Sequence, residues 1–272
     1  MYRQVGVATT FSPRFLAVLS EAASVSRSMK APLCLIHADV FQPEKDARFR
    51  EAIRRLGLDE NLDIHFQAGD PSEAILKVQT NARIDLLVAG ALETESVHRN
   101  FTGNVARELL RRAPCDLILT TNPKEEPNLP SETVVVLPDL SDWSKHVFHR
   151  AVDLAEKQGT RQLTLVYVQT TFAEAKEKAL GNANGAEQVE CSLETLIKQR
   201  EQCPVELDFH VLRGNTGFTA CEFIQSSSAD LVVMPSQLSP PDMAPFAPVL
   251  DWIIQVIPKK LWVIRQVENR HQ

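Results

Sequence analysis

The stretch from Asp85 to Thr121, DLLVAGALETESVHRNFTGNVARELLRRAPCDLILTT, contains strand, loop, helix and strand patterns in one uninterrupted run. The apolar run Leu86–Ala89 ends at Gly90, which is typical of a strand buried on both faces of a parallel sheet. After the loop, apolar residues recur at helical spacing from Val105 to Leu110, and Pro114 ends the helix. A second apolar strand follows, so the stretch predicts one unit of a parallel α/β sheet.

The loop inside this stretch is the candidate ligand site. A loop that leaves a parallel strand and enters a helix brings free amides and the positive end of the helix dipole together. Gly90 and Gly103 bound the loop, and Asn104 follows it. We expect these three residues to contact a ligand. Simpler alternatives stay open, because glycines also permit sharp turns and Asn104 is also a preferred helix N-cap.

Composition narrows the class of protein. The chain has 272 residues, of which 44% are hydrophobic and 24% charged, as in ordinary globular proteins. A net charge of -6 argues against nucleic acid as a partner. No apolar run reaches the roughly 20 residues that span a membrane, and no signal-peptide pattern precedes Val5, so we expect a cytoplasmic protein without membrane contact. Five scattered cysteines without a CxxC pair favour neither a disulfide framework nor a zinc cluster.

Strands and helices alternate through the first half. Besides the opening stretch, strands are predicted at Val5–Ala8, Leu33–Ala38 and Leu62–Phe66, with helices between them. Ser12 and Pro13 have the residue types of an N-cap and a first helical position. The order predicts a doubly wound, five-stranded, mostly parallel sheet.

The same order then repeats. Asn122–Ser131 contains three prolines and no apolar face, which is typical of a linker. Beyond it, Thr10 corresponds to Asp139 at an offset of 129 residues, and Asp85 to Asp230 at an offset of 145. The growing offset indicates an insertion of about 15 residues, most simply a longer second helix. We therefore expect domains at residues 1–122 and 132–272, joined by a linker at 123–131.

Three segments in this order resemble the universal stress protein family. They are Val7–Ser12 (VATTFS), Leu86–Gly90 (LLVAG) and Arg111–Leu119 (RRAPCDLIL), and the resemblance covers nearly the whole chain as two tandem copies. It implies two α/β domains of the adenine nucleotide alpha hydrolase-like fold.

The resemblance also implies a nucleotide site. In the nucleotide-binding members of the family, an Asp at the tip of strand one meets adenosine, and a G-x2-G-x9-G-[S/T] loop holds the phosphates of ATP. The first copy has Thr10 in place of that Asp, Glu93 in place of the second glycine, and Asn104 after Gly103. A glutamate adds bulk and like charge beside phosphate. The departures imply at most weak binding of ATP, with Mg, in the first domain, through Thr10, Gly90, Gly103 and Asn104.

The second copy departs in the opposite way. Asp139 occupies the position of the family's Asp, where it would contact a nucleotide or cap the helix beginning near Ser141. The glycine loop is replaced by Met234–Pro248, which contains five prolines. Proline lacks an amide donor and fixes φ, so this loop cannot form an amide cradle for phosphate.

The leading functional hypothesis is a non-catalytic stress-response protein that acts through protein partners the sequence does not identify. Walker, nucleophile-elbow and adenylyl-transfer motifs are missing, and His146 and His149 lack a third metal ligand. In the family, domains often pair through their last strands, which implies an intramolecular pseudo-dimer and a possible homodimer. One alternative is an ATP-binding protein with slow hydrolysis. Another is an apolar-ligand module in the second domain, using Met234, Met243, Phe246 and Trp252.

Overall fold

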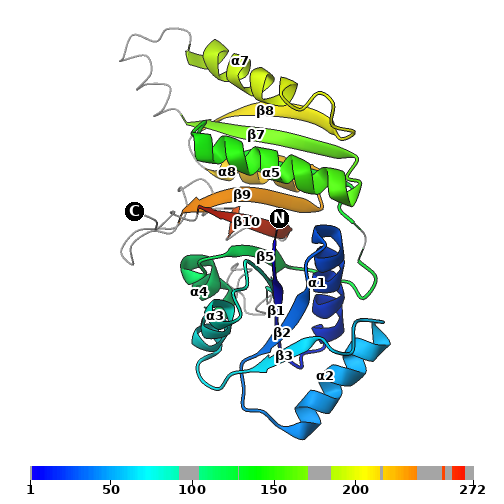
Figure 1. The fold of residues 1–272 in the computed structure, drawn as a ribbon. Coiled ribbons are helices and arrows are strands. Elements are labelled where there is room, and N and C mark those ends of the chain that lie inside the picture. Colours follow the sequence, from blue (N-terminus) through cyan, green and yellow to red (C-terminus); the bar gives the residue numbers. More distant parts are fainter. Residues whose placement is uncertain are drawn as a thin grey trace, which may run out of the picture. The chain divides into compact units, whose positions relative to one another are not determined.

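The computed structural model describes residues 2–91, 104–127, 129–170, 185–214, 217–237, 253–254 and 259–266. The chain divides into two compact units, the first within residues 1–128 and the second within residues 129–266. Within each unit the described strands pair in parallel, and helices alternate with them (Figure 1). The expected α/β class with two doubly wound domains is confirmed.

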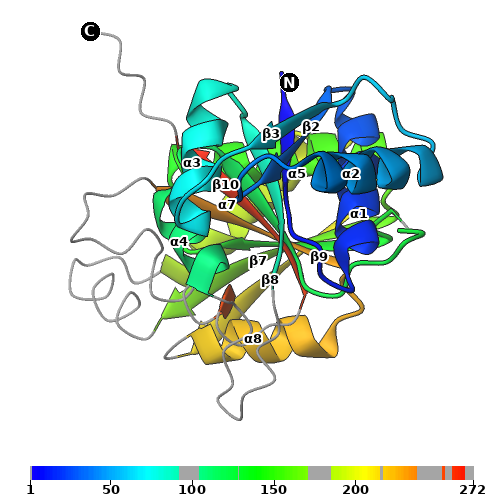
Figure 2. The ribbon, with the colours of Figure 1, turned by 90° about the horizontal axis from the view of Figure 1, so that it is seen from below.

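The first unit has five strands in the spatial order β3-β2-β1-β4-β5. Its elements are β1 (Val5–Thr9), α1 (Phe15–Met29), β2 (Leu33–His37), α2 (Pro43–Arg55), β3 (Asp63–Phe66), α3 (Pro71–Asn81), β4 (Leu86–Gly90), α4 (Asn104–Arg112) and β5 (Asp116–Thr120). Figures 1 and 2 show α1 and α2 on one face of this sheet and α3 and α4 on the other. This two-sided cover explains why strands β4 and β5 read as continuous apolar runs.

The central strand β1 is packed closely from both sides. Val5 and Val7 have no exposed surface. A Cβ atom at Gly6 would lie 2.6 Å from Cδ1 of Ile84 and 3.3 Å from Cδ1 of Ile36, so only glycine fits this position without moving the core. The packing of β1 therefore depends on the absence of a side chain at Gly6 as well as on the buried side chains of Val5 and Val7.

The start of α1 differs from the sequence-based prediction. Ser12 and Pro13 were expected as N-cap and first helical residue, but α1 begins at Phe15 with Arg14 as the N-cap residue and no side-chain cap. The amide of Phe15 donates to the carbonyl of Ser12, a tight three-residue turn, and the first four-residue bond runs from Val18 to Arg14. Ser12 and Pro13, which were predicted to start the helix, therefore belong to the turn that precedes it.

The second unit repeats the arrangement, with the spatial order β10-β9-β6-β7-β8. Its described elements are β6 (Glu132–Leu137), α5 (Asp142–Gln158), β7 (Gln162–Thr170), α7 (Gly185–Lys198), β8 (Glu206–Gly214), α8 (Gly217–Ser226), β9 (Leu231–Gln237) and β10 (Lys260–Gln266). Helices α5 and α8 lie on opposite faces of the sheet (Figure 2).

Part of the predicted insertion lies in strands. Helix α7 has 14 residues, close to the 13 of its counterpart α2, whereas β7 and β8 have nine residues each and β2 and β3 have five and four. Residues 171–184 lie outside the described part. In the described ranges, no helix is long and apolar enough to cross a membrane.

Candidate functional site

A cavity of about 270 Å³ lies at the carboxyl ends of β1 and β4 in the first unit. Strand β1 pairs with β2 on one side and with β4 on the other, so the order of strands reverses here. Crossovers leave β1 and β4 toward opposite faces, which opens a crevice at the strand ends and makes this the place where doubly wound sheets bind ligands. Ala8–Thr10 and Ala89–Ala91 form its floor.

Three helices form apolar walls around this floor. Their contacting side chains are Phe15 and Val18 of α1, Ile75 of α3, and Val105, Ala106 and Leu109 of α4. Gly90 lies close to the side chain of Val18. A Cβ atom at position 90 would lie 3.1 Å from Cγ2 of the valine, so a larger residue would fit only if Val18 moved. A small, mostly apolar cavity with few polar groups is the usual form of a small-molecule site.

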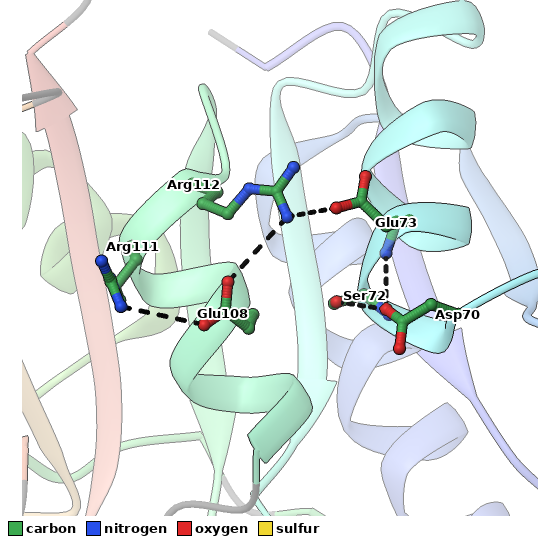
Figure 3. A network of polar contacts seen from close by, with 6 residues as sticks. All are labelled: Asp70, Ser72, Glu73, Glu108, Arg111 and Arg112. Atoms are coloured by element: carbon green, nitrogen blue, oxygen red, sulfur yellow. Dashed lines mark hydrogen bonds and ion pairs between the residues drawn. The ribbon is translucent and has the colours of Figure 1, made fainter. Parts of the chain in front are cut away.

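A polar network on the surface holds α3 against α4 (Figure 3). Arg112 pairs with Glu73 of α3 and approaches Glu108 at 3.9 Å, while Asp70 caps α3 by accepting from the amides of Ser72 and Glu73 at 3.0 and 3.2 Å. The hydrogen bond from Arg112 lowers the pKa of Glu73, and the hydroxyl of Ser72 lowers that of Asp70. Exposed pairs of this kind add little stability, although both of the helices that they connect line the cavity.

His37, at the end of β2, supplies a buried polar ring to the cavity and is 6% exposed. Its Nδ1 lies 3.1 Å from the carbonyl oxygen of Thr9, so Nδ1 donates and Nε2 is the acceptor in the neutral ring. Nε2 finds no hydrogen-bond partner among the described residues and lies 4.0 Å from Oδ2 of Asp39. Edge-on contacts with Phe49 and Phe66 fix the ring from behind.

Arg14 is the charged residue of the cavity lining in the described part of the chain. It precedes the first turn of α1, and its Nη1 donates to the carbonyl oxygen of Thr121 at 3.3 Å. Hydroxyl groups of Thr9, Thr10, Ser12 and Thr120 complete the polar part of the lining. The arrangement combines an apolar chamber with a cationic edge.

The structure brings two of the five predicted site residues to the cavity. Thr10 and Gly90 line it, and Asn104 is the first residue of α4, whose next two residues line it as well. Gly103 and Glu93 lie outside the described residues. Asp139 belongs to the second unit, where it follows β6.

Sequence reasoning missed Arg14, His37 and Phe15 as cavity residues. Phe15 and Val18 fall at helical spacing, a pattern typical of core positions, although both line the cavity. A usable signal existed for His37, because a histidine that closes an apolar strand lies at the carboxyl edge, where ligands bind. Arg14 carried no comparable signal, because an arginine near a helix start is usually a solvated residue.

Asp139 has the geometry of a local cap. Its Oδ1 accepts from the amide of Ser141 at 3.0 Å and from the hydroxyl of Ser144 at 2.6 Å. Ser141 in turn caps α5 by accepting from the amide of Ser144. Burial raises the pKa of Asp139, but the hydrogen bonds from Ser141 and Ser144 outweigh this effect and leave the pKa below its ordinary value. A contact between Asp139 and a ligand stays a prediction.

Comparison with known proteins identifies the family. The sequence model described as "Universal stress protein family" matches residues 1–121 and again residues 130–265. The chain belongs to the universal stress protein family. Its two units are therefore tandem copies of the family domain, as the sequence resemblance implied.

Solved structures agree with this family fold. A candidate universal stress protein from Pseudomonas aeruginosa UCBPP-PA14 is similar with a TM-score of 0.75 at 14% identity, covering 98% of this chain and 94% of its own. A universal stress protein from Archaeoglobus fulgidus DSM 4304 is similar with a TM-score of 0.65 at 13% identity, covering 96% and 98%. Identities this low establish the fold alone. No curated protein matches the chain.

The two universal stress protein domains differ at their first strand tips. Thr10 of the first domain faces the cavity and carries no charge, whereas Asp139 of the second is held by its own serines. Met234, one of the residues considered for an apolar site in the second domain, is fully buried in β9, and Met243, Phe246 and Trp252 lie outside the described residues. Among the described residues, no group of three or more His, Cys, Asp or Glu side chains could hold a metal ion.

The cap at Asp139 predicts a pH-dependent contribution to stability. Asp139→Ala removes two acceptor contacts of an exposed carboxylate and should lower the free energy of unfolding of the second domain by about 1 kcal/mol at pH 7. The folded pKa lies below the ordinary 3.8, so the contribution is complete above that value and is lost as pH falls through the folded pKa. Urea unfolding between pH 3 and pH 7 measures the difference.

Asp139→Asn is the matched control for this prediction. Asparagine keeps an acceptor oxygen but does not titrate in this range, so its stability difference from Asp139→Ala should not change with pH. A wild-type advantage over Asp139→Ala that grows as pH falls from 7 to 3 would contradict the assignment.

Proposed function

We propose that this universal stress protein is a non-catalytic, ligand-responsive protein, in which the cavity of the first domain binds a small molecule. The supporting observation is the cavity itself, at the point where the strand order reverses, with apolar walls and a few polar atoms at one edge. A cavity of about 270 Å³ is comparable to the smaller ligand pockets of proteins.

The lining supports binding rather than catalysis. In the described part of the chain it contains hydroxyl groups, one arginine and one histidine, but no carboxylate and no lysine. Nucleophilic or acid–base chemistry requires a nucleophile held by a base, or paired groups with separated pKa values. Among the described residues, His37 donates Nδ1–H to the backbone carbonyl oxygen of Thr9, and its Nε2 makes no hydrogen bond to a hydroxyl group.

Ligand binding would act on partners through a shift of populations. A molecule bound between β1, α1 and α4 stabilises the arrangement in which these elements enclose it, by RT ln(1 + [L]/Kd). The surface formed by their ends would then differ in population between the free and the bound protein. Binding of a protein partner that recognises one of the two states would then depend on the concentration of the ligand. We expect the protein to act in the cytoplasm.

The uncharged aromatic probe N-phenyl-1-naphthylamine tests the cavity. Ala38 lines it and is half-buried, so Ala38→Phe should fill space and weaken probe binding at least about tenfold. Ala47 is exposed on α2 and does not line the cavity, so Ala47→Phe is the matched control and should bind as the wild type does. Fluorescence titration measures both, with one site per chain expected.

An equal response of the two variants would show that the probe binds elsewhere. Unchanged thermal unfolding of Ala38→Phe in the absence of probe would exclude a loss of binding through misfolding.

Adenine nucleotide is a second candidate ligand. Gly90 of the family's glycine loop lies at the cavity floor, where a missing side chain permits close approach of a ligand. Thr10 stands at the position of the family's Asp, which removes a carboxylate that would meet adenosine. ATP, with Mg and slow hydrolysis, would therefore bind more weakly here than to a copy with the full motif.

Calorimetric titration with ATP and Mg separates the two candidates. The leading proposal predicts no binding up to about millimolar ATP, which bounds the binding free energy at roughly -4 kcal/mol. Tight binding that is lost in Gly103→Val would instead support the nucleotide candidate, since a branched side chain in the loop blocks the approach of phosphate oxygens.

A further inference from the structure

The chain that leaves β5 continues along the first-domain cavity. Thr120, the last residue of β5, lines the cavity, and Pro123 lines it as well. Thr121, which lies between them in the sequence, is 6% exposed. The segment that was expected as a linker therefore begins as part of the cavity wall. We call residues 121–125 the strap.

The first end of the strap is held at the start of α1. Arg14 is the N-cap residue of this helix, and its Nη1 donates to the carbonyl oxygen of Thr121 at 3.3 Å. Arg14 also lines the cavity. The strap is therefore fixed at the edge of the cavity from its first residue.

The second end of the strap is held by two helices. Oγ of Ser20, on α1, donates to the carbonyl oxygen of Glu125 at 2.6 Å. Nη2 of Arg55, on α2, lies 2.8 Å from Oε2 of the same glutamate. Pro123 lies in the chain between the two attached ends and lines the cavity. Attachment at both ends thus keeps this proline in the cavity wall.

The two contacts of Glu125 differ in strength. Ser20 is 6% exposed, so its hydrogen bond is shielded from water. The side chains of Arg55 and Glu125 are 60% and 53% exposed, and an ion pair this exposed contributes little. The hydroxyl group of Ser20 is therefore the main attachment at this end of the strap.

From these contacts we infer that the strap is a gate of the cavity. When the strap is attached, Pro123 closes one side of the cavity, and when the strap detaches, that side opens and a ligand can enter or leave. A bound ligand touches the attached strap and stabilises it. The coupling is reciprocal, so attachment of the strap strengthens ligand binding by the same factor. The inference rests on the proposed function, because it concerns access to the same site.

The gate also gives the ligand an effect beyond the cavity. The strap precedes the second unit, which begins at residue 129. The number of free residues in a linker sets its reach. A ligand that stabilises the attached strap therefore shortens the free part of the chain that joins the two units.

The release rate of N-phenyl-1-naphthylamine tests the gate. Exit of the probe requires a detached strap, so loss of one hydrogen bond in Ser20→Ala should speed release about two- to tenfold. Ser26→Ala is the matched control. Ser26 is on the same helix and outside the cavity lining, and its Oγ donates to the carbonyl oxygen of Ala31 at 2.6 Å. This variant should release the probe at the wild-type rate in stopped-flow fluorescence.

Cutting of the strap by a protease gives a readout that needs no ligand. A glutamate-specific protease cuts after Glu125 but poorly after Glu126, because Pro127 follows. Where the strap opens and closes faster than it is cut, the rate at which fragment 1–125 appears follows the population of the detached strap. Ser20→Ala should raise this rate by about the same factor as the release rate. Saturating probe should lower it at least about fivefold in the wild type.

Arg55→Gln changes the strap contact from the surface and carries the test even where Ser20→Ala fails to fold. It removes the exposed ion pair with Glu125 and should speed probe release about twofold. Arg54→Gln is its matched control, because Arg54 is the adjacent exposed arginine of α2 and lies outside the cavity lining. Added salt should speed release from the wild type more than from Arg55→Gln, because screening weakens the ion pair.

The outcomes separate this inference from the proposed function. Release and cutting rates of Ser20→Ala and Arg55→Gln that equal those of their matched controls overturn the gate, while the cavity remains a ligand site. Cutting after Glu125 that saturating probe leaves unchanged also overturns the gate. Probe binding that ignores Ala38→Phe overturns the proposed function and this inference together. Faster release and faster cutting in Ser20→Ala, with protection of the wild type by the probe, support both.

Discussion

The reversal of strand order at β1 is the constraint on which the rest of the first domain depends. The chain builds β1, β2 and β3 outward in one direction and then returns through α3 to place β4 against the free side of β1. Helices on the two sides of this point cover opposite faces, so no crossover fills the space above the ends of β1 and β4. The order of the strands therefore produces the crevice, whichever side chains line it.

Side chains then decide what this crevice can accept. Gly6 lets β1 lie against Ile84 and Ile36, and Gly90 lets the floor approach Val18. The apolar faces of α1, α3 and α4 enclose the chamber, and the ion pair of Arg112 with Glu73 connects two of these helices at the surface. Thr10 stands where the nucleotide-binding members of the family carry an aspartate, and Arg14 lines the same edge of the cavity.

The fold was largely predictable from the sequence, whereas the cavity lining was not. Apolar runs that end at glycine, and their repetition after a linker, predicted the strands and both domains, because burial on two faces leaves a strong pattern. Gly90 was predicted because it ends an apolar strand, and Thr10 because it stands at the position of the family's aspartate. Phe15 and Val18 could not be told apart from core residues, since a residue facing a cavity has the same apolar character as one facing another helix. Arg14 and His37 both line the cavity because strands that are distant in sequence pair in the sheet. The local pattern of apolar residues does not show which strands pair.

The measurement that tests the central claim most directly is methyl NMR of the full chain, labelled at isoleucine, leucine and valine, during titration with N-phenyl-1-naphthylamine. The account predicts shifts concentrated on Val18, Ile75 and Leu109, which line the cavity from three helices. The core methyl groups of Val135 and Leu165 in the second domain should stay unchanged. Shifts in the second-domain core, or none at the three cavity residues under saturating dye, would contradict the claim that this cavity is the ligand site.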